Sequence, residues 1–304
     1  MRDGVDDQSV DAADKDRGGS GPEALSNGPE EQTCQDCGAR LHGPYCAQCG
    51  QHASDLHLTV GHFLHDALDG FFSFDSRVWT TVALLLRRPG FLTVEYWRGR
   101  RTRYLAPLRV YLFVSFLAFL VQGVLPSEPP DDLDADVSEV SAQVADDEID
   151  WDQDFADAAP VLRWMALNLL RPAVEQPERM RAIYFQRLPA VVFLLVPFFA
   201  ALLRVLYRKS DSYFVPHLVF ALHFHSAGFV LFTVGALGDY VTGRDFPGDW
   251  AALGMGVLLF LSLCRAYGNS RLRTAWKETV LMSLHLLTAA VALTLLFFVT
   301  GLLM

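Results

Sequence analysis

The chain has 304 residues, 51% of them hydrophobic, and a formal net charge of −10 at pH 7. The acidity comes from two segments: residues 1–31 carry nine acidic and three basic side chains, and residues 128–157 carry thirteen acidic and no basic ones. The rest of the chain has 22 basic and 13 acidic residues, a net charge of +9, which excludes a uniformly acidic soluble protein and indicates a basic, apolar, membrane-embedded part.

Residues 1–31 are rich in Asp, Gly, Ser and Pro and poor in apolar side chains. Such a composition buries too little apolar surface to offset the entropy lost on ordering. We therefore expect a disordered acidic tail.

Residues 32–53 contain two C-x-x-C pairs separated by eight residues. Structural zinc sites use four tetrahedral ligands, often thiolates, so this spacing predicts a four-cysteine zinc ribbon with the ligands Cys34, Cys37, Cys46 and Cys49. A module of about twenty residues cannot bury a core, so the ion would hold it together. All four positions around the ion are filled, which favours a structural rather than a catalytic site.

Two disulfides are the alternative for these cysteines. The first thirty residues are polar and acidic rather than a cleavable signal peptide, which favours the metal. His42 and His52 lie nearby and are either solvated loop residues or substitutes for a cysteine. Cys264 lies in an apolar helix, where we expect a small buried side chain.

The apolar runs within residues 54–104 are too short to span a membrane, and their pattern is typical of juxtamembrane amphipathic helices. We expect one helix at 59–69 and a second at 76–88 that Pro89 and Gly90 end, both lying in the membrane interface. A basic patch follows, which we expect against the inner leaflet as a positive-inside anchor: Arg98, Arg100, Arg101 and Arg103. Specific binding of anionic lipid or nucleic acid is the alternative for this patch.

Five stretches are long and apolar enough to cross a bilayer core, which needs about twenty residues. They are residues 105–125, 188–207, 216–237, 251–267 and 279–303, and Pro197 is expected to kink the second. A soluble helical core is the alternative, but several such runs in one short chain argue against it. We expect an all-α membrane protein with about five transmembrane helices plus interfacial helices, the transmembrane domain covering residues 105–304 behind a small zinc-ribbon module.

Lys and Arg cluster before the first span, between the second and third, and between the fourth and fifth. The positive-inside rule then places the N-terminus and the zinc ribbon in the cytosol and the C-terminus outside, unless residues 251–267 fail to cross. The large extracytoplasmic loop covers 126–187. Its second half predicts a helix at 161–170 that stops before Pro172.

Four histidines lie inside the predicted spans, and ionisable groups there are functional candidates because they are costly to place. They form a possible intramembrane polar site: His217, His223 and His225 on the third span and His285 on the fifth. At about 100° per residue, His223 and His225 point to opposite faces, so a metal or proton site needs one or two of the three together with His285. Neutral histidines bonded to the backbone or to nearby serines are the alternative, which we favour.

Several motifs together carry a resemblance to a known family. They are the knuckle Cys46-x-x-Cys49-Gly50-Gln51, then Arg88-Pro89, then Gly99-Arg100-Arg101-x-Arg103-Tyr104-x-x-Pro107, and a later segment from His217 to Ser226. From about residue 30 onward, leaving out the acidic loop, the chain resembles a bacterial multi-pass membrane family with an N-terminal zinc ribbon, catalogued only as a domain of unknown function. The resemblance implies the bacterial inner membrane and a cytosolic zinc site at the four cysteines, and it implies no activity.

The sequence contains no nucleophile motif, phosphate loop, H-E-x-x-H or paired intramembrane carboxylates. We therefore expect a non-enzymatic role, in which the ribbon is a docking or assembly module for a cytosolic protein partner and the bilayer is the other partner. A transporter of small solutes or ions that uses the intramembrane histidines is the alternative, and an intramembrane enzyme is the third. Nucleic acid is not an expected partner, and homo-oligomer formation stays open.

Overall fold

The computed structural model describes residues 33–52, 61, 77–125, 150–208, 213–243 and 248–303. The predicted tail at 1–31, nearly all of the predicted helix at 59–69 and the acidic stretch 128–149 lie outside these residues. Within the described ranges there are two isolated β-bridges and no β-strand. The labelled helices are α2 (Arg77–Arg87), α3 (Phe91–Trp97), α4 (Pro107–Val124), α6 (Trp151–Asp154), α7 (Pro160–Met165), the π-helical η1 (Ala166–Leu170), α8 (Arg171–Glu175), α9 (Pro177–Leu206), α10 (Phe214–Thr242), α11 (Gly248–Tyr267) and α12 (Arg271–Leu302).

Five of the described helices are long and apolar enough to cross a membrane, namely α4, α9, α10, α11 and α12. Each overlaps one of the predicted spans almost completely, so the predicted all-α membrane fold with about five candidate spanning helices is confirmed. The shortest predicted span lies in α11, whose 20 residues extend about 30 Å at 1.5 Å per residue. α9 begins earlier than predicted and continues as a helix through Pro189 and Pro197.

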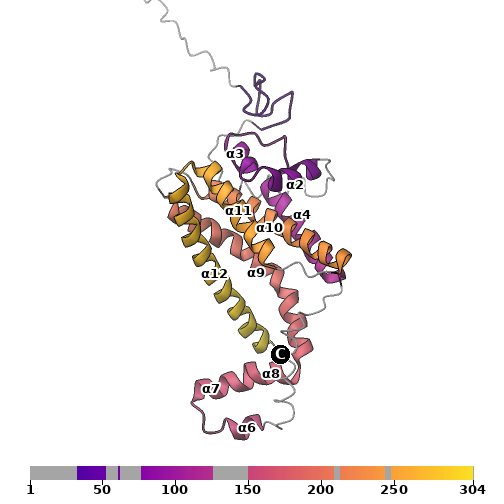
Figure 1. Ribbon diagram of the computed structural model, residues 1–304, viewed down its shortest axis with the longest axis vertical. Helices are drawn as coiled ribbons and strands as arrows, with labels where there is room; N and C mark the ends of the chain where they lie inside the picture. The colour runs from indigo at the N-terminus through magenta and orange to yellow at the C-terminus, as the bar shows by residue number, and fades with distance from the viewer. Residues whose placement is uncertain are drawn as a thin grey trace, which may run out of the picture.

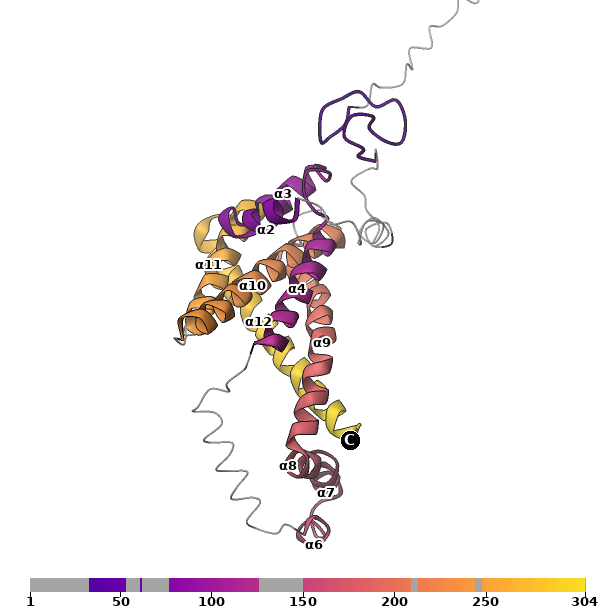
Figure 2. The same ribbon diagram turned by 90° about the vertical axis from the view of Figure 1, so that its right-hand side faces the viewer.

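The central helix of the bundle is α10, which packs against α4, α9 and α11 and also against the short helices α2 and α3. α12 runs along α9 and α11 (Figures 1 and 2). The core between them is apolar and aromatic, and Tyr111, Phe199, Leu203 and Phe220 are each at most 2% exposed. Many large apolar side chains on α12 are exposed, as expected of a helix that a bilayer covers.

α2 and α3 close one end of the bundle. Val78 and Leu85 of α2 and Leu92 of α3 are buried against α4 and α10, so the apolar face predicted for 76–88 packs on protein. Trp79 faces away and is 70% exposed, a position that suits the polar boundary of a membrane.

The opposite end of the bundle carries α6, α7, η1 and α8 (Figure 1). The predicted stop before Pro172 is wrong, because the helical path continues to Glu175. A π-helical turn directly precedes the proline and joins α7 to α8 without a break, and its wider winding accommodates Pro172 within the continuous helical path. Gly301 near the end of α12 packs here: a Cβ on it would lie 2.9 Å from the carbonyl oxygen of Asn168.

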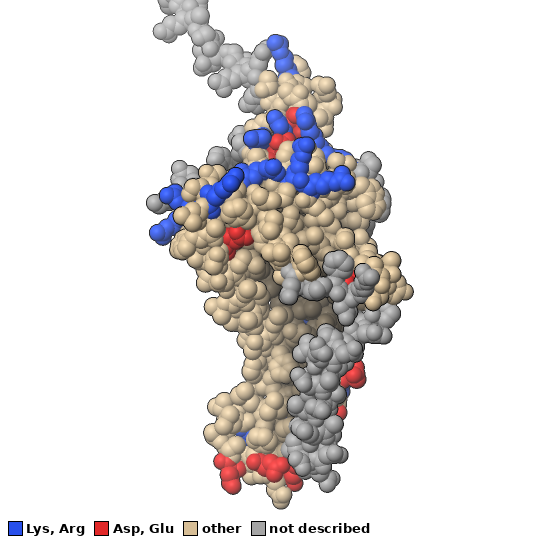
Figure 3. All heavy atoms as spheres, in the orientation of Figure 1, with Lys and Arg blue, Asp and Glu red and all other residues tan. Residues whose placement is uncertain are grey.

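Charge is segregated along the bundle, as Figure 3 shows for one face. Lys and Arg gather in a band at the end where α2, α3 and the cysteine module lie, and the surface below this band is mostly uncharged. Acidic side chains gather at the far end, near α6. This asymmetry is the pattern from which the orientation was predicted.

Candidate metal centre and its contact with the membrane domain

The four cysteines predicted as ligands lie together. Their sulfur atoms are all within 4.8 Å of one another. Cys34 Sγ lies 3.5 Å from Cys49 Sγ, and Cys37 Sγ lies 3.5 Å from Cys46 Sγ, so each contact joins one C-x-x-C pair to the other. All five cysteines of the chain are free thiols. Sulfurs about 2.3 Å from a tetrahedral ion stand about 3.8 Å apart, so the donor set fits one such ion.

Two tight turns hold the thiols in place. Gly38 and Gly50 have φ angles of 77° and 75°, the left-handed region that glycine adopts at no steric cost. Their N–H groups donate to the carbonyl oxygens of Cys34 and Cys46, each at 2.8 Å. The position of both glycines after the second cysteine of each pair is therefore a backbone requirement.

The thiols resist simultaneous ionisation. Backbone N–H groups of Cys49 and Gln48 lower the pKa of the Cys46 thiol to about 7. The backbone N–H of Ala39 acts to lower the pKa of Cys37, but desolvation and the three neighbouring thiols together raise it to about 12. A divalent ion at the centre offsets the repulsion among thiolates and releases their protons on binding.

The module is attached to the membrane domain through Asp36, which lies between the two cysteines of the first pair. Its carboxylate accepts a hydrogen bond from Thr102 Oγ1 at 2.7 Å and lies 3.4 Å from Arg103 Nε. Arg103 also donates to the carbonyl oxygen of Asp36 at 2.8 Å. The Asp36 side chain is only 4% exposed, so these contacts are needed to offset the cost of burying its charge.

The second attachment is made by Gln51, two residues after Cys49. Its amide nitrogen donates to the carbonyl oxygen of Gly99 at 2.6 Å, and its amide oxygen accepts from the N–H of Arg101 at 3.3 Å. Gly99 has a φ of 81°, and a Cβ on it would lie 1.8 Å from Gln35 Oε1. We call residues 99–103 the docking loop, since both attachments end there.

The predicted basic patch has contacts of its own within the chain. Arg98 and Arg100 pair with Glu95 at 3.3 and 3.0 Å, and the Glu95 side chain is 4% exposed. Arg101 lies over the ring of Tyr96, 5.0 Å from its centroid. The arginines therefore shape the docking loop, and a contact with the inner leaflet stays a prediction.

The three histidines of α10 face three different helices. His217 Nδ1 is 2.7 Å from the hydroxyl of Tyr267 on α11, and His223 Nδ1 is 3.0 Å from Thr93 Oγ1 on α3. His225 packs edge to face against His285 of α12, with ring centroids 5.4 Å apart. The structure thus brings His225 and His285 together and keeps the other two histidines away from them.

A family model described as a protein of unknown function (DUF3667) matches residues 75–119. These residues cover α2, α3, the docking loop and most of α4, and they do not include the cysteines. No curated protein and no solved structure matches the chain.

Sequence reasoning missed the groups that attach the module, namely Asp36, Gln51, Glu95 and Thr102. Asp36 and Gln51 stand beside ligands, but nothing in a single sequence indicates that a polar residue in a knuckle is paired 48 to 67 positions away. The two cysteine pairs gave a direct signal because their spacing alone carries the chemistry.

Proposed function

We propose that the module binds one zinc ion and docks a cytosolic protein partner at the basic end of an inner-membrane helix bundle. Its double attachment to the docking loop carries this proposal. Asp36 is bracketed by two ligands and Gln51 follows the last one, so an ion that fixes the knuckles also fixes both attachments. Metal binding by such a module supplies its folding energy.

The proposed partner surface includes Tyr45, which opens the second knuckle. Its side chain is 63% exposed and packs edge to face against His52, with ring centroids 4.8 Å apart. An exposed aromatic side chain held rigid by its neighbour is a common anchor in protein interfaces. The candidate metal-binding group consists of the four cysteines, and neither His42 nor His52 belongs to it.

The test is in-cell cross-linking of the tagged full-length protein, followed by purification. Tyr45→Ala removes the proposed anchor, and Cys46→Ser removes a ligand. Gln48→Ala is the control, because Gln48 is an exposed residue of the same knuckle. We expect wild type and the control to capture the same partner and both other variants to lose it. A partner captured equally by all four proteins would contradict docking through the module.

A second function, transport of a proton or small cation, is favoured by one observation. His225 Nε2 and His285 Nδ1 are buried and have no hydrogen-bond partner among the described residues, although their rings are in contact. His225 Nδ1 is bonded to the carbonyl oxygen of Ala221 at 2.8 Å, so Nε2 is the His225 nitrogen left to pass a proton or hold an ion together with His285. Ion flux into liposomes containing the protein is the measurement. His225→Phe, His285→Phe and the double variant should lose the same flux without adding, and independent, partial losses would contradict a shared site.

A further inference from the structure

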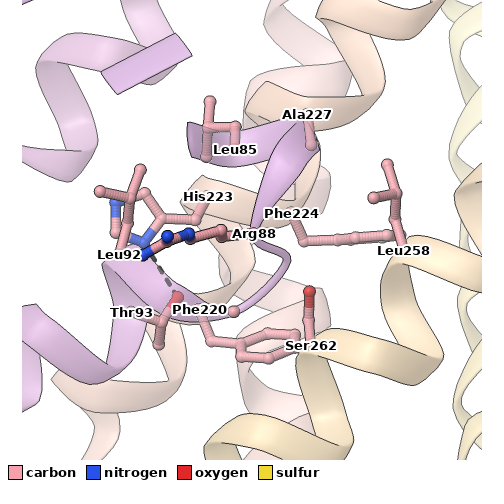
Figure 4. Close-up of a pocket in the computed structure, with 11 residues that line it drawn as sticks. Leu85, Arg88, Leu92, Thr93, Phe220, His223, Phe224, Ala227, Leu258 and Ser262 are labelled. Atoms are coloured by element: carbon pink, nitrogen blue, oxygen red, sulfur yellow. Dashed lines mark hydrogen bonds between the residues drawn. The ribbon is translucent and has the colours of Figure 1, made fainter. Parts of the chain in front are cut away.

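A small cavity lies where the turn between α2 and α3 meets α10 and α11 (Figure 4). Its volume is about 20 Å³. Four of its lining side chains are polar, namely Arg88, Thr93, His223 and Ser262, and most of the others are apolar. Neither the cysteine module nor the His225–His285 pair lines it.

The turn itself forms a fixed wall of the cavity. Gly90 has a φ of 73°, and a Cβ on it would lie 2.9 Å from Ser262 Cα and from Ser262 O. Arg265 holds the turn from the other side by donating to the carbonyl oxygen of Pro89 at 2.7 Å. The turn therefore packs directly on α11, and two positively charged side chains lie here: Arg88 on the turn and Arg265 beside it.

The polar side chains that line the cavity can all form hydrogen bonds, and one of them, Arg88, carries a full positive charge. Thr93 and His223 bond each other at 3.0 Å. Arg88 is exposed, and within the described part of the chain it has no ion-pair partner. Its guanidinium lies 5.7 Å from the Phe91 ring centroid, and Figure 4 shows the side chain lying across the cavity toward Leu92 and His223.

The cavity lies near the end of the bundle that carries the basic band. Ser262 is roughly 8 Å from the end of α11 at Tyr267, at a rise of 1.5 Å per residue. Trp79 of the adjacent α2 is exposed, and the band of Lys and Arg in Figure 3 runs across this end of the bundle. A phosphate that approaches here meets a positive field and an arginine, the side chain that best matches phosphate geometry.

We propose that this cavity binds the phosphate of an anionic glycerophospholipid. A volume of about 20 Å³ holds little more than one water-sized atom, which excludes a solute buried whole. One phosphate oxygen enters between Ser262 and the Thr93–His223 pair, and Arg88 covers the other oxygens. The glycerol and acyl chains stay in the leaflet that surrounds the helices.

The experiment is a calorimetric titration of the full-length protein in a neutral detergent. The probes are dioctanoyl phosphatidylglycerol, dioctanoylglycerol, which lacks the phosphate, and inorganic phosphate. Arg88→Gln removes the charge at the cavity. Arg87→Gln is the matched control, because Arg87 is the neighbouring exposed arginine and does not line the cavity. Ser262→Ala removes a lining hydroxyl without changing the charge.

We expect saturable binding of phosphatidylglycerol that weakens about tenfold in Arg88→Gln, a change of about 1.4 kcal/mol, and stays within twofold in Arg87→Gln. Ser262→Ala should weaken it by a smaller factor. Equal losses in Arg87→Gln and Arg88→Gln would show only a general positive surface and overturn the site. Absent saturation, or equal binding of dioctanoylglycerol, would also overturn it. Inorganic phosphate binding as tightly as the lipid would overturn the assignment to a lipid.

Discussion

Asp36 lies between two of the predicted ligands, and its side chain is only 4% exposed. Its nearly buried carboxylate meets Thr102 and Arg103, so one side chain joins the metal module to the start of the membrane domain. Removal of the Asp36 carboxylate leaves the hydrogen-bond donors of Thr102 and Arg103 without their acceptor, so the cost of taking them out of water is no longer offset.

Asp36→Ala should loosen the docking loop. Hydrogen bonds to a charged group contribute about 1.5–3 kcal/mol, and because Arg103 is half-exposed we expect about 1–2 kcal/mol here. That corresponds to a roughly five- to thirtyfold larger population of the detached module. The arginines of the loop are trypsin sites, so the rate of cleavage within 98–103 measures this population. Gln48→Ala is the control, and an unchanged cleavage rate in Asp36→Ala would show that the contact does not hold the loop.

The elements are joined by close backbone contacts that glycine permits. Gly90 and Gly268 both have positive φ, at 73° and 62°. Only Gly90 is packed, because a Cβ on it would meet the backbone of Ser262, whereas a Cβ on Gly268 would have nothing within 4 Å. The two positions separate the cost of the dihedral angle from the cost of the contact.

Gly268→Ala should reduce the stability of the protein by only the conformational cost of a left-handed residue with a Cβ, about 1–2 kcal/mol. Gly90→Ala should reduce the stability clearly more than Gly268→Ala does, because the turn must also move away from α11. Thermal unfolding of both full-length variants in detergent is the measurement. Equal melting temperatures for the two variants would show that the turn does not pack tightly on α11.

The five long helices were predictable from the sequence because an apolar run of about twenty residues is a signal within one segment and needs no knowledge of its packing partners, whereas α3 and α6 were not predicted. The end of α2 was also predictable, because Pro89 and Gly90 are a local helix-stop signal. The continuation through Pro172 was not predictable, since it depends on the π-helical turn before the proline. The seating of α2 and α3 on α10, and the pairing of His225 with His285, depend on packing between distant segments, which a single sequence does not show.

At the scale of the whole molecule, the five candidate spanning helices predict that the chain ends lie on opposite sides of the bilayer. The cysteine module and the band of Lys and Arg lie at the same end of the bundle, and the end of α12 lies at the other (Figures 1 and 3). Because positive charge is retained on the cytosolic side, we expect the module inside and the C-terminus outside.

A reporter fused after Met304 tests this orientation. A phosphatase that folds only outside the cytosol should be active at that position, and a fluorescent protein that folds only inside should be dark. The opposite pattern would contradict this orientation and would mean either that the whole bundle is inverted or that one of the five helices does not cross. In the second case α11 is the first to examine, because its candidate span has the lowest hydropathy of the five.

The proposed metal ion should organise the cysteine module and thereby hold the docking loop. Metal analysis of the full-length protein, combined with amide hydrogen exchange of residues 99–103 before and after chelation, tests both effects. We predict one zinc per chain, none in Cys46→Ser, and much faster exchange of the docking loop when the metal is absent. A metal-free, disulfide-bonded module, or a docking loop that is equally protected with and without the ion, would contradict this prediction.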